Sequence, residues 1–69
     1  REVDHGITLL PNNYRLVLMY SIYMQLNDEE IADIMNTSPA NIRKIRSRAR
    51  QRLKEILFER KWGEKYEED

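Results

Sequence analysis

Residues 27–57 read NDEEIADIMNTSPANIRKIRSRARQRLKEIL, a run that contains two predicted helices separated by a short break. The first helix is expected over about 28–35. Asn27 and Glu30 form a capping-box pattern before it, in which each side chain bonds to the backbone N–H of the other residue. The break falls at Asn36, a residue that adopts a left-handed conformation at modest cost.

The next helix is expected to start at Ser38, an N-cap residue, followed by Pro39, which suits a first turn. After Pro39, apolar residues recur at spacings of three and four, which indicates one buried face on a helix that can run to about residue 60. The stripe consists of Ile42, Ile45, Ala49, Leu53, Ile56 and Leu57. A short helix, a tight turn and a longer basic helix form the helix-turn-helix pattern, whose second helix enters the DNA major groove.

A further helix is predicted upstream, over about 11–25, because Pro11 suits a first turn and apolar residues follow at helical spacing. Residues before it are polar and mixed, and we expect them to be loosely ordered. The predicted fold class is all-α, a small helix-turn-helix bundle of three to four helices with a long basic recognition helix. The predicted organisation is a polar lead segment over 1–9, a helix-turn-helix DNA-binding domain over 10–60 and an acidic tail over 61–69.

The charge is strongly segregated along the chain. Its 69 residues carry 12 basic and 12 acidic side chains, yet residues 43–54 hold seven cations and no acid. Such a run along one helix is self-repelling unless a polyanion or nearby acids relieve it. A nucleic acid is therefore the expected partner, and the helix-turn-helix pattern makes it double-stranded DNA. The other interpretation is a bundle whose basic helix is only a solvated face, balanced by the acidic segments.

The face opposite the apolar stripe carries the hydrogen-bond donors. With 100° per residue, this outward face holds Ala40, Arg43, Lys44, Ser47, Arg48 and Gln51, with Asn41 and Arg46 at its margins. Arg and Lys suit guanine, Asn and Gln suit adenine, and free N–H groups at the helix start suit a phosphate. The flanking arginines at 46, 50 and 52 are expected to contact phosphates or to pair with acids.

Three runs resemble region 4 of bacterial sigma factors of the extracytoplasmic-function (ECF) type. They are Leu10–Leu18 with its Leu-Pro and Tyr-Arg pairs, the Glu-Glu-Ile-Ala core at 29–32, and the recognition helix with its basic continuation over 38–57. The resemblance implies promoter recognition in transcription initiation, by binding the −35 element in the major groove and docking on the β flap of RNA polymerase. An anti-sigma factor is a further candidate partner.

The resemblance also implies roles for single residues. Base-facing positions are Pro39, Ala40, Asn41, Arg43 and Lys44, and Arg48 is a backbone contact, with Arg15 and Thr37 as further candidates. Since Pro39 and Ala40 offer no side-chain hydrogen bond, readout rests on the other three. The complete set of candidate DNA-binding residues is Thr37, Ser38, Pro39, Ala40, Asn41, Arg43, Lys44, Ser47 and Arg48.

Two other function classes share parts of this pattern. LuxR-type output domains have a similar Glu-Ile-Ala helix, but they usually dimerise through a helix after the recognition helix, whereas this chain continues as a basic run. A helix-turn-helix module that binds only protein would be insensitive to the loss of Arg43, Lys44 and Arg48.

Aromatic residues follow the basic run at a spacing of four, namely Phe58, Trp62 and Tyr66. On a straight helix they form an exposed stripe opposite the core, a possible partner surface. The favoured expectation is that the helix bends or ends near 60–63 and these aromatics fold back on the first helix.

Several classes of protein find no support. The chain has no cysteine, no glycine-rich phosphate loop and no nucleophile with a base, so we expect no metal, no cofactor and no enzymatic activity. The longest apolar stretch, at 16–20, is far shorter than the roughly 20 residues of a membrane span. The expected location is the cytoplasm.

Overall fold

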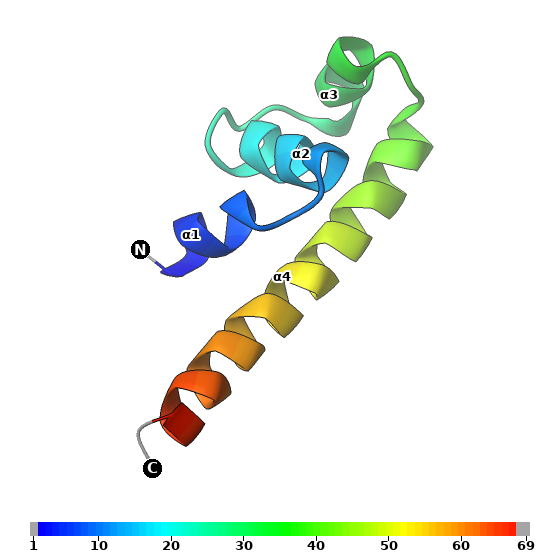
Figure 1. Cartoon of the computed structure of the whole chain (residues 1–69). Coiled ribbons are helices and arrows are strands. Elements are labelled where there is room, and N and C mark those ends of the chain that lie inside the picture. The colour runs from blue at the N-terminus through cyan, green and yellow to red at the C-terminus, as the bar shows by residue number, and fades with distance from the viewer. Residues whose placement is uncertain (1, 68–69) are drawn as a thin grey trace.

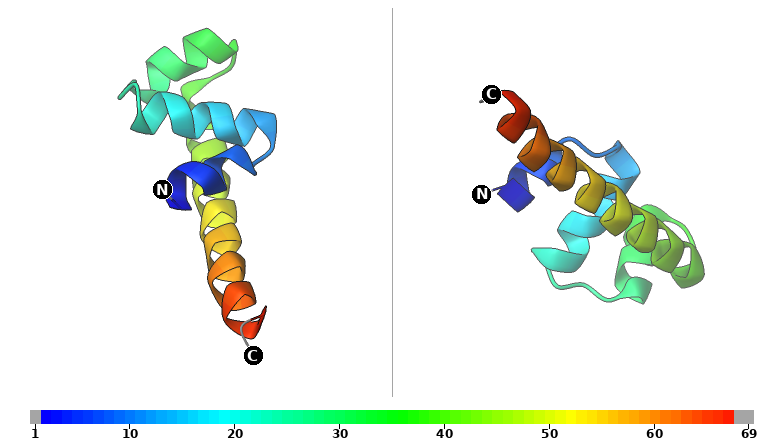
Figure 2. Two further views of the ribbon diagram at one scale, coloured as in Figure 1. Left: turned by 60° about the vertical axis from the view of Figure 1, so that its left-hand side comes forward. Right: turned by 90° about the horizontal axis from the view of Figure 1, so that it is seen from below.

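The computed structural model describes residues 2–67, with side chains for residues 2–59, and consists of four helices in that range. They are α1 (Glu2–Thr8), α2 (Asn12–Ile22), α3 (Asp28–Met35) and α4 (Pro39–Glu67). The three short helices pack along the first part of α4, which continues alone beyond α1 (Figures 1 and 2). Because no strand occurs between residues 2 and 67, the predicted all-α class is confirmed.

The helix-turn-helix over α3 and α4 forms as its local chemistry predicts. The Glu30 amide donates to Asn27 Oδ1 at 2.8 Å, and the Asn27 amide donates to Glu30 Oε1 at 2.9 Å. Asn36 ends α3 in the left-handed region, with φ of 56°, and its N–H donates to the Ala32 and Asp33 carbonyls. At the start of α4, Ser38 Oγ accepts from the Asn41 amide at 3.1 Å. Both helix starts are therefore capped by side chains, which satisfies amides that have no partner inside the helix.

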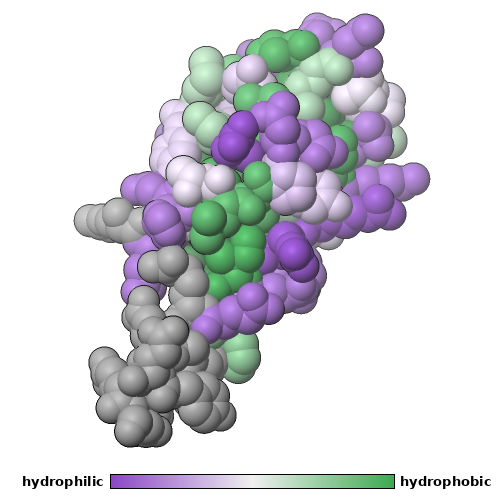
Figure 3. Space-filling view, in the orientation of Figure 1, coloured by the Kyte–Doolittle hydropathy of each residue, from purple (hydrophilic) through white to green (hydrophobic). Residues whose placement is uncertain are grey.

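Two small clusters of buried side chains hold the bundle together. The first consists of Ile7, Leu10, Leu18 and Ala49, and the second of Val17, Ile31, Ala32 and Ile42. Neighbouring positions of α2 supply both clusters, and α4 supplies one residue of its apolar stripe to each. Figure 3 shows hydrophobic residues between α4 and the shorter helices, and hydrophilic ones along the outer edge of α4. The predicted stripe is thus the inner face of α4.

The expectation that residues 1–9 are loosely ordered is wrong for residues 2–8, which form α1. Within this polar segment Gly6 and Ile7 are buried, and Ile7 joins the first cluster together with Leu10. The absence of a side chain at Gly6 lets α1 lie directly against Leu53 of α4. The Tyr23 hydroxyl, just after α2, donates a hydrogen bond to the Asp4 carboxylate. Two buried contacts and one hydrogen bond thus dock a segment whose other residues are exposed.

The upstream helix is shorter than the predicted span of 11–25, because α2 ends at Ile22. Gln25 takes a left-handed backbone with φ of 55°, and the turn returns Leu26 to the second cluster. The chain thus leaves the helix and packs a half-buried apolar side chain against the core.

The last helix is longer than expected, since α4 runs to Glu67 without a break at 60–63. Phe58 is 63% exposed and does not fold back on the short helices, so that expectation is wrong for this residue. The side chains of Trp62 and Tyr66 lie outside the described ones. Over residues 2–67, no helix combines the length and apolar character needed to cross a membrane.

Candidate DNA-binding interface

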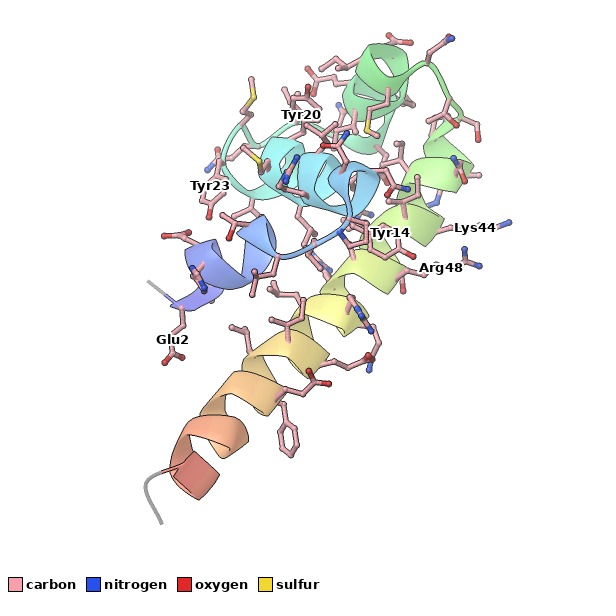
Figure 4. All side chains as sticks on the ribbon, in the orientation of Figure 1. Glu2, Tyr14, Tyr20, Tyr23, Lys44 and Arg48 are labelled. Atoms are coloured by element: carbon pink, nitrogen blue, oxygen red, sulfur yellow. The ribbon has the colours of Figure 1, made fainter. Side chains whose placement is uncertain are left out.

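All nine predicted DNA-binding residues lie together, on the turn before α4 and on its first turns. Thr37 and Pro39 are half-buried, and the other seven, including Ala40 and Ser47, are exposed. Lys44 and Arg48 project from successive turns on the same side of α4, away from the bundle (Figure 4). The buried face of this segment carries Ile42 and Ala49, so the exposed face is held in a fixed orientation.

The first turn of α4 positions one candidate base contact. Asn41 Nδ2 donates a hydrogen bond to Thr37 Oγ1 at 2.9 Å, which orients the Asn41 amide. The carboxamide keeps a second N–H and its oxygen available, and these are the donor and acceptor that adenine requires. Thr37 therefore orients the Asn41 side chain, a contact that was not predicted from the sequence.

Arg43 and Arg46 differ sharply in how they are held. The Arg46 guanidinium makes a two-pronged contact with the Asp28 carboxylate, through Nη1 to Oδ1 and through Nη2 to Oδ2 at 3.2 Å. Arg43 Nη1 lies 3.8 Å from Asp28 Oδ2, and its side chain stays 60% exposed. The flanking arginines were expected to contact phosphates or to pair with acids, and Arg46 pairs with an acid.

Asp28 is a neighbour of the candidate interface whose contacts with Arg46 and Arg43 were not predicted from the sequence. It stands at the first position of α3, where an acid is already explained by the helix dipole. The hydrogen bond from Arg46 holds the pKa of the Asp28 carboxyl below its ordinary value of 3.8, against the opposing effect of burial, and the charges of Arg46 and Arg43 act in the same direction. The carboxylate is therefore ionised at neutral pH.

A shallow groove runs along one flank of α4 and is lined by cations and polar groups without an acid. Its lining residues are Arg43, Arg46, Ser47, Arg50, Gln51 and Lys54. A second recess lies between the starts of α3 and α4, where Asn27, Asp28, Glu29 and Pro39 meet Arg43. Arg43 thus stands at the junction of a basic groove and an acidic recess. Apart from Arg46, whose charge is paired with Asp28, the cations of this groove suit a phosphate chain, which carries regularly spaced negative charge.

Comparisons with known proteins agree with this geometry. A family model described as "Sigma-70, region 4" matches residues 1–53. The ECF RNA polymerase sigma factor SigM of Bacillus subtilis (strain 168) is 47% identical over 57 residues, which cover 81% of this chain and 35% of SigM. The chain therefore spans about a third of the length of that relative. No solved structure was found that matches the chain.

The family match begins at residue 1, so it includes α1, which the residue-level resemblance over 10–57 did not cover. The resemblance to region 4 of an ECF-like sigma factor is confirmed by both the family model and the relative. The chain belongs to the sigma-70 region 4 family.

Proposed function

We propose that this domain binds the −35 element of a promoter by placing the start of α4 in the major groove. The observation that carries the proposal is the position of the acid-free basic run. It begins four residues after a capped helix start, and its Arg43, Lys44 and Arg48 side chains are exposed while Ile42 and Ala49 of the same helix are buried. A helix with one buried face and cations on its exposed face suits the width and charge of the major groove.

In this proposal Asn41, Arg43 and Lys44 meet base edges, while Pro39 and Ala40 provide close apolar contact. Ser38 already caps α4, so its exposed position favours a contact to the DNA backbone rather than to a base. The remaining backbone contacts are Thr37, Ser47 and Arg48, with Arg15 as a further candidate. Arg15 is half-buried, and its Nη2 donates to Asn12 Oδ1 at 2.5 Å at the start of α2.

We further propose that the domain docks on RNA polymerase through the β flap. Support comes from the apolar side chains that stay exposed at the end of α2, since Ile22, Tyr23 and Met24 are 43%, 51% and 60% exposed. Exposed apolar groups that cluster on a small domain are typical of protein-binding surfaces. Phe58 on α4 is a second candidate for such a surface, with Trp62 and Tyr66 further along the helix. A domain with these partners would act in the cytoplasm, and an anti-sigma factor would compete for the same surfaces.

Selection from a pool of randomised 20-base-pair duplexes tests the DNA-binding proposal. The domain should enrich one short sequence, and fluorescence anisotropy should then measure its affinity for the selected duplex and for a scrambled one. Arg43→Ala and Lys44→Ala should each lose about 1–3 kcal/mol on the selected duplex and relax the preference. The matched control is Arg52→Ala, because Arg52 is equally exposed but lies 3.7 Å from Glu55 and away from the base-facing side.

Two outcomes would contradict this proposal. Selection without enrichment would show that the isolated domain has no sequence preference. Unchanged DNA binding after the combined loss of Arg43, Lys44 and Arg48 would favour a module that binds only protein. The polymerase contact is tested separately, by titrating the domain with an isolated β-flap fragment. An Ala triple variant at Ile22, Tyr23 and Met24 is compared with one at Phe58, Trp62 and Tyr66.

A further inference from the structure

We propose that Asp28 is a specificity-determining positioning residue of the DNA interface, which keeps Arg46 off the phosphates and restrains Arg43 at the groove. This inference rests on the proposed DNA-binding function. It assigns a task to an acid on α3 that lies outside the recognition helix and is 18 residues distant from Arg46.

Burial distinguishes the Asp28–Arg46 pair from an ordinary surface ion pair. The Asp28 side chain is 21% exposed and that of Arg46 is 24% exposed, and two parallel contacts join them. A two-pronged contact fixes the plane of the guanidinium, so it sets the direction of the arginine as well as neutralising its charge. Arg46 is therefore held against the start of α3.

The position of Arg46 makes this restraint relevant to DNA. Arg46 lines the basic groove together with Arg43 and Arg50. If Asp28 were neutral, the Arg46 guanidinium would be released from this pair and could reach a phosphate bound along the groove. Such a contact would strengthen binding to every sequence equally, because phosphates carry no sequence information.

Asp28 also acts on Arg43, though more weakly. The distance of 3.8 Å and the 60% exposure of the Arg43 side chain leave it able to exchange this contact for a base. Asp28 and Glu29 make the adjoining recess acidic, so a phosphate is repelled from that side of Arg43. This repulsion disfavours a contact between Arg43 and a DNA phosphate, and so favours a contact between Arg43 and a base edge.

Salt dependence of binding provides a readout that a merely structural role would not change. On the scrambled duplex, each additional phosphate contact steepens the slope of log affinity against log salt by about 0.9. Asp28→Asn should therefore bind this duplex more tightly than the wild type at 50 mM salt. It should then lose about threefold more affinity than the wild type between 50 and 200 mM. Its preference for the selected duplex should fall.

Matched variants separate the proposed role from charge and folding effects. Asp33→Asn makes the same change of charge on the same helix, at an exposed residue for which no ion pair is found among the described side chains. It should leave the slope nearly unchanged. Asp28→Glu keeps a carboxylate and should restore most of the wild-type slope and preference. Circular dichroism spectra of all variants establish that each is folded at the temperature of the titration.

Arg46→Gln gives a test that does not depend on altering Asp28. If Arg46 makes no phosphate contact in the wild type, this variant keeps the wild-type slope, and Asp28→Asn combined with Arg46→Gln returns to that slope. The proposal is overturned if Arg46→Gln alone lowers the slope by about 0.9, because Arg46 would then already contact DNA.

The proposal is also overturned if Asp28→Asn weakens binding to both duplexes equally at an unchanged salt slope. The same conclusion follows if Asp33→Asn changes binding as Asp28→Asn does. The salt slopes are measured on the scrambled duplex, so they can be compared between variants whether or not the wild type prefers a sequence. These outcomes are therefore distinct from failure of the proposed function, which is absence of sequence preference in the wild type.

Discussion

Gly6 of α1 packs against Leu53 of α4 so closely that a Cβ added to Gly6 would lie 2.8 Å from Leu53 Cδ1. The same Cβ would lie 3.1 Å from Leu57 Cδ2. The two leucines belong to the inner stripe of α4, and Leu53 packs against the first core cluster. This contact joins the first helix to the last one, and it explains why a glycine stands inside α1 despite its low helix propensity.

Substitutions at Gly6 should separate the effect of side-chain volume from that of helix propensity. Gly6→Leu should lower the free energy of unfolding by about 1–3 kcal/mol, because a large side chain must push α1 away from α4. Gly6→Ala should change it by less than about 1 kcal/mol, because the Leu53 methyl can rotate and alanine favours the helix. Urea unfolding followed by circular dichroism measures both. Equal stability of the Leu variant and the wild type would show that α1 does not dock.

Two isoleucines should respond very differently to truncation. Ile42→Ala should cost about 2–5 kcal/mol, since Ile42 is fully buried in the second core cluster. Ile34→Ala removes the same atoms from a side chain that is 52% exposed, and should cost less than about 1 kcal/mol. A domain of this size has only a few kcal/mol of stability, so Ile42→Ala should be largely unfolded in a thermal melt. Similar midpoints for the two variants would contradict the burial assigned to Ile42.

The capping box at the start of α3 should make a measurable contribution to stability. Asn27→Ala removes the acceptor of the Glu30 amide and should lower the free energy of unfolding by about 0.5–2 kcal/mol. Asn13→Ala, at an exposed position inside α2, is the matched control and should have little effect. Chemical denaturation of both variants measures the difference. A cost as small as that of the control would mean that water replaces the cap without loss.

Acid should weaken the domain through the Asp28–Arg46 pair. The folded pKa of Asp28 lies below its ordinary value of 3.8, so the unfolded chain binds this proton more readily than the folded one. The stability from this ion pair is therefore fully present above pH 3.8 and is lost as the pH falls through the lower, folded pKa. Urea unfolding of the wild type and of Asp28→Asn from pH 6 to pH 2 measures it. The difference in free energy of unfolding between the two proteins should be constant near neutrality and should become smaller below pH 3.8. A difference that is independent of pH would exclude the carboxylate as its source.

The sequence by itself determined the features that form within one or two turns of a helix. The capping box at Asn27, the left-handed Asn36, the cap at Ser38 and the stripe from Ile42 onward were all predicted and are all present. Their hydrogen bonds and apolar spacings join residues three or four apart, so local propensity is sufficient to specify them. The same periodicity placed Arg43, Lys44 and Arg48 on the outward face, whereas Thr37 and Pro39 were added by the resemblance to region 4.

Tertiary structure alone decided which distant residues meet. The docking of α1 through Gly6 and Ile7 depends on a gap beside Leu53, and the pairing of Arg46 with Asp28 depends on how α3 crosses α4. A polar segment with one buried isoleucine has no periodic pattern strong enough to predict a helix. An acid at a helix start is already explained by the helix dipole, so nothing marks it as the partner of an arginine 18 residues away. Such contacts arise only when packing of the apolar faces brings the helices together, because the free energy that orders them comes from the shared core.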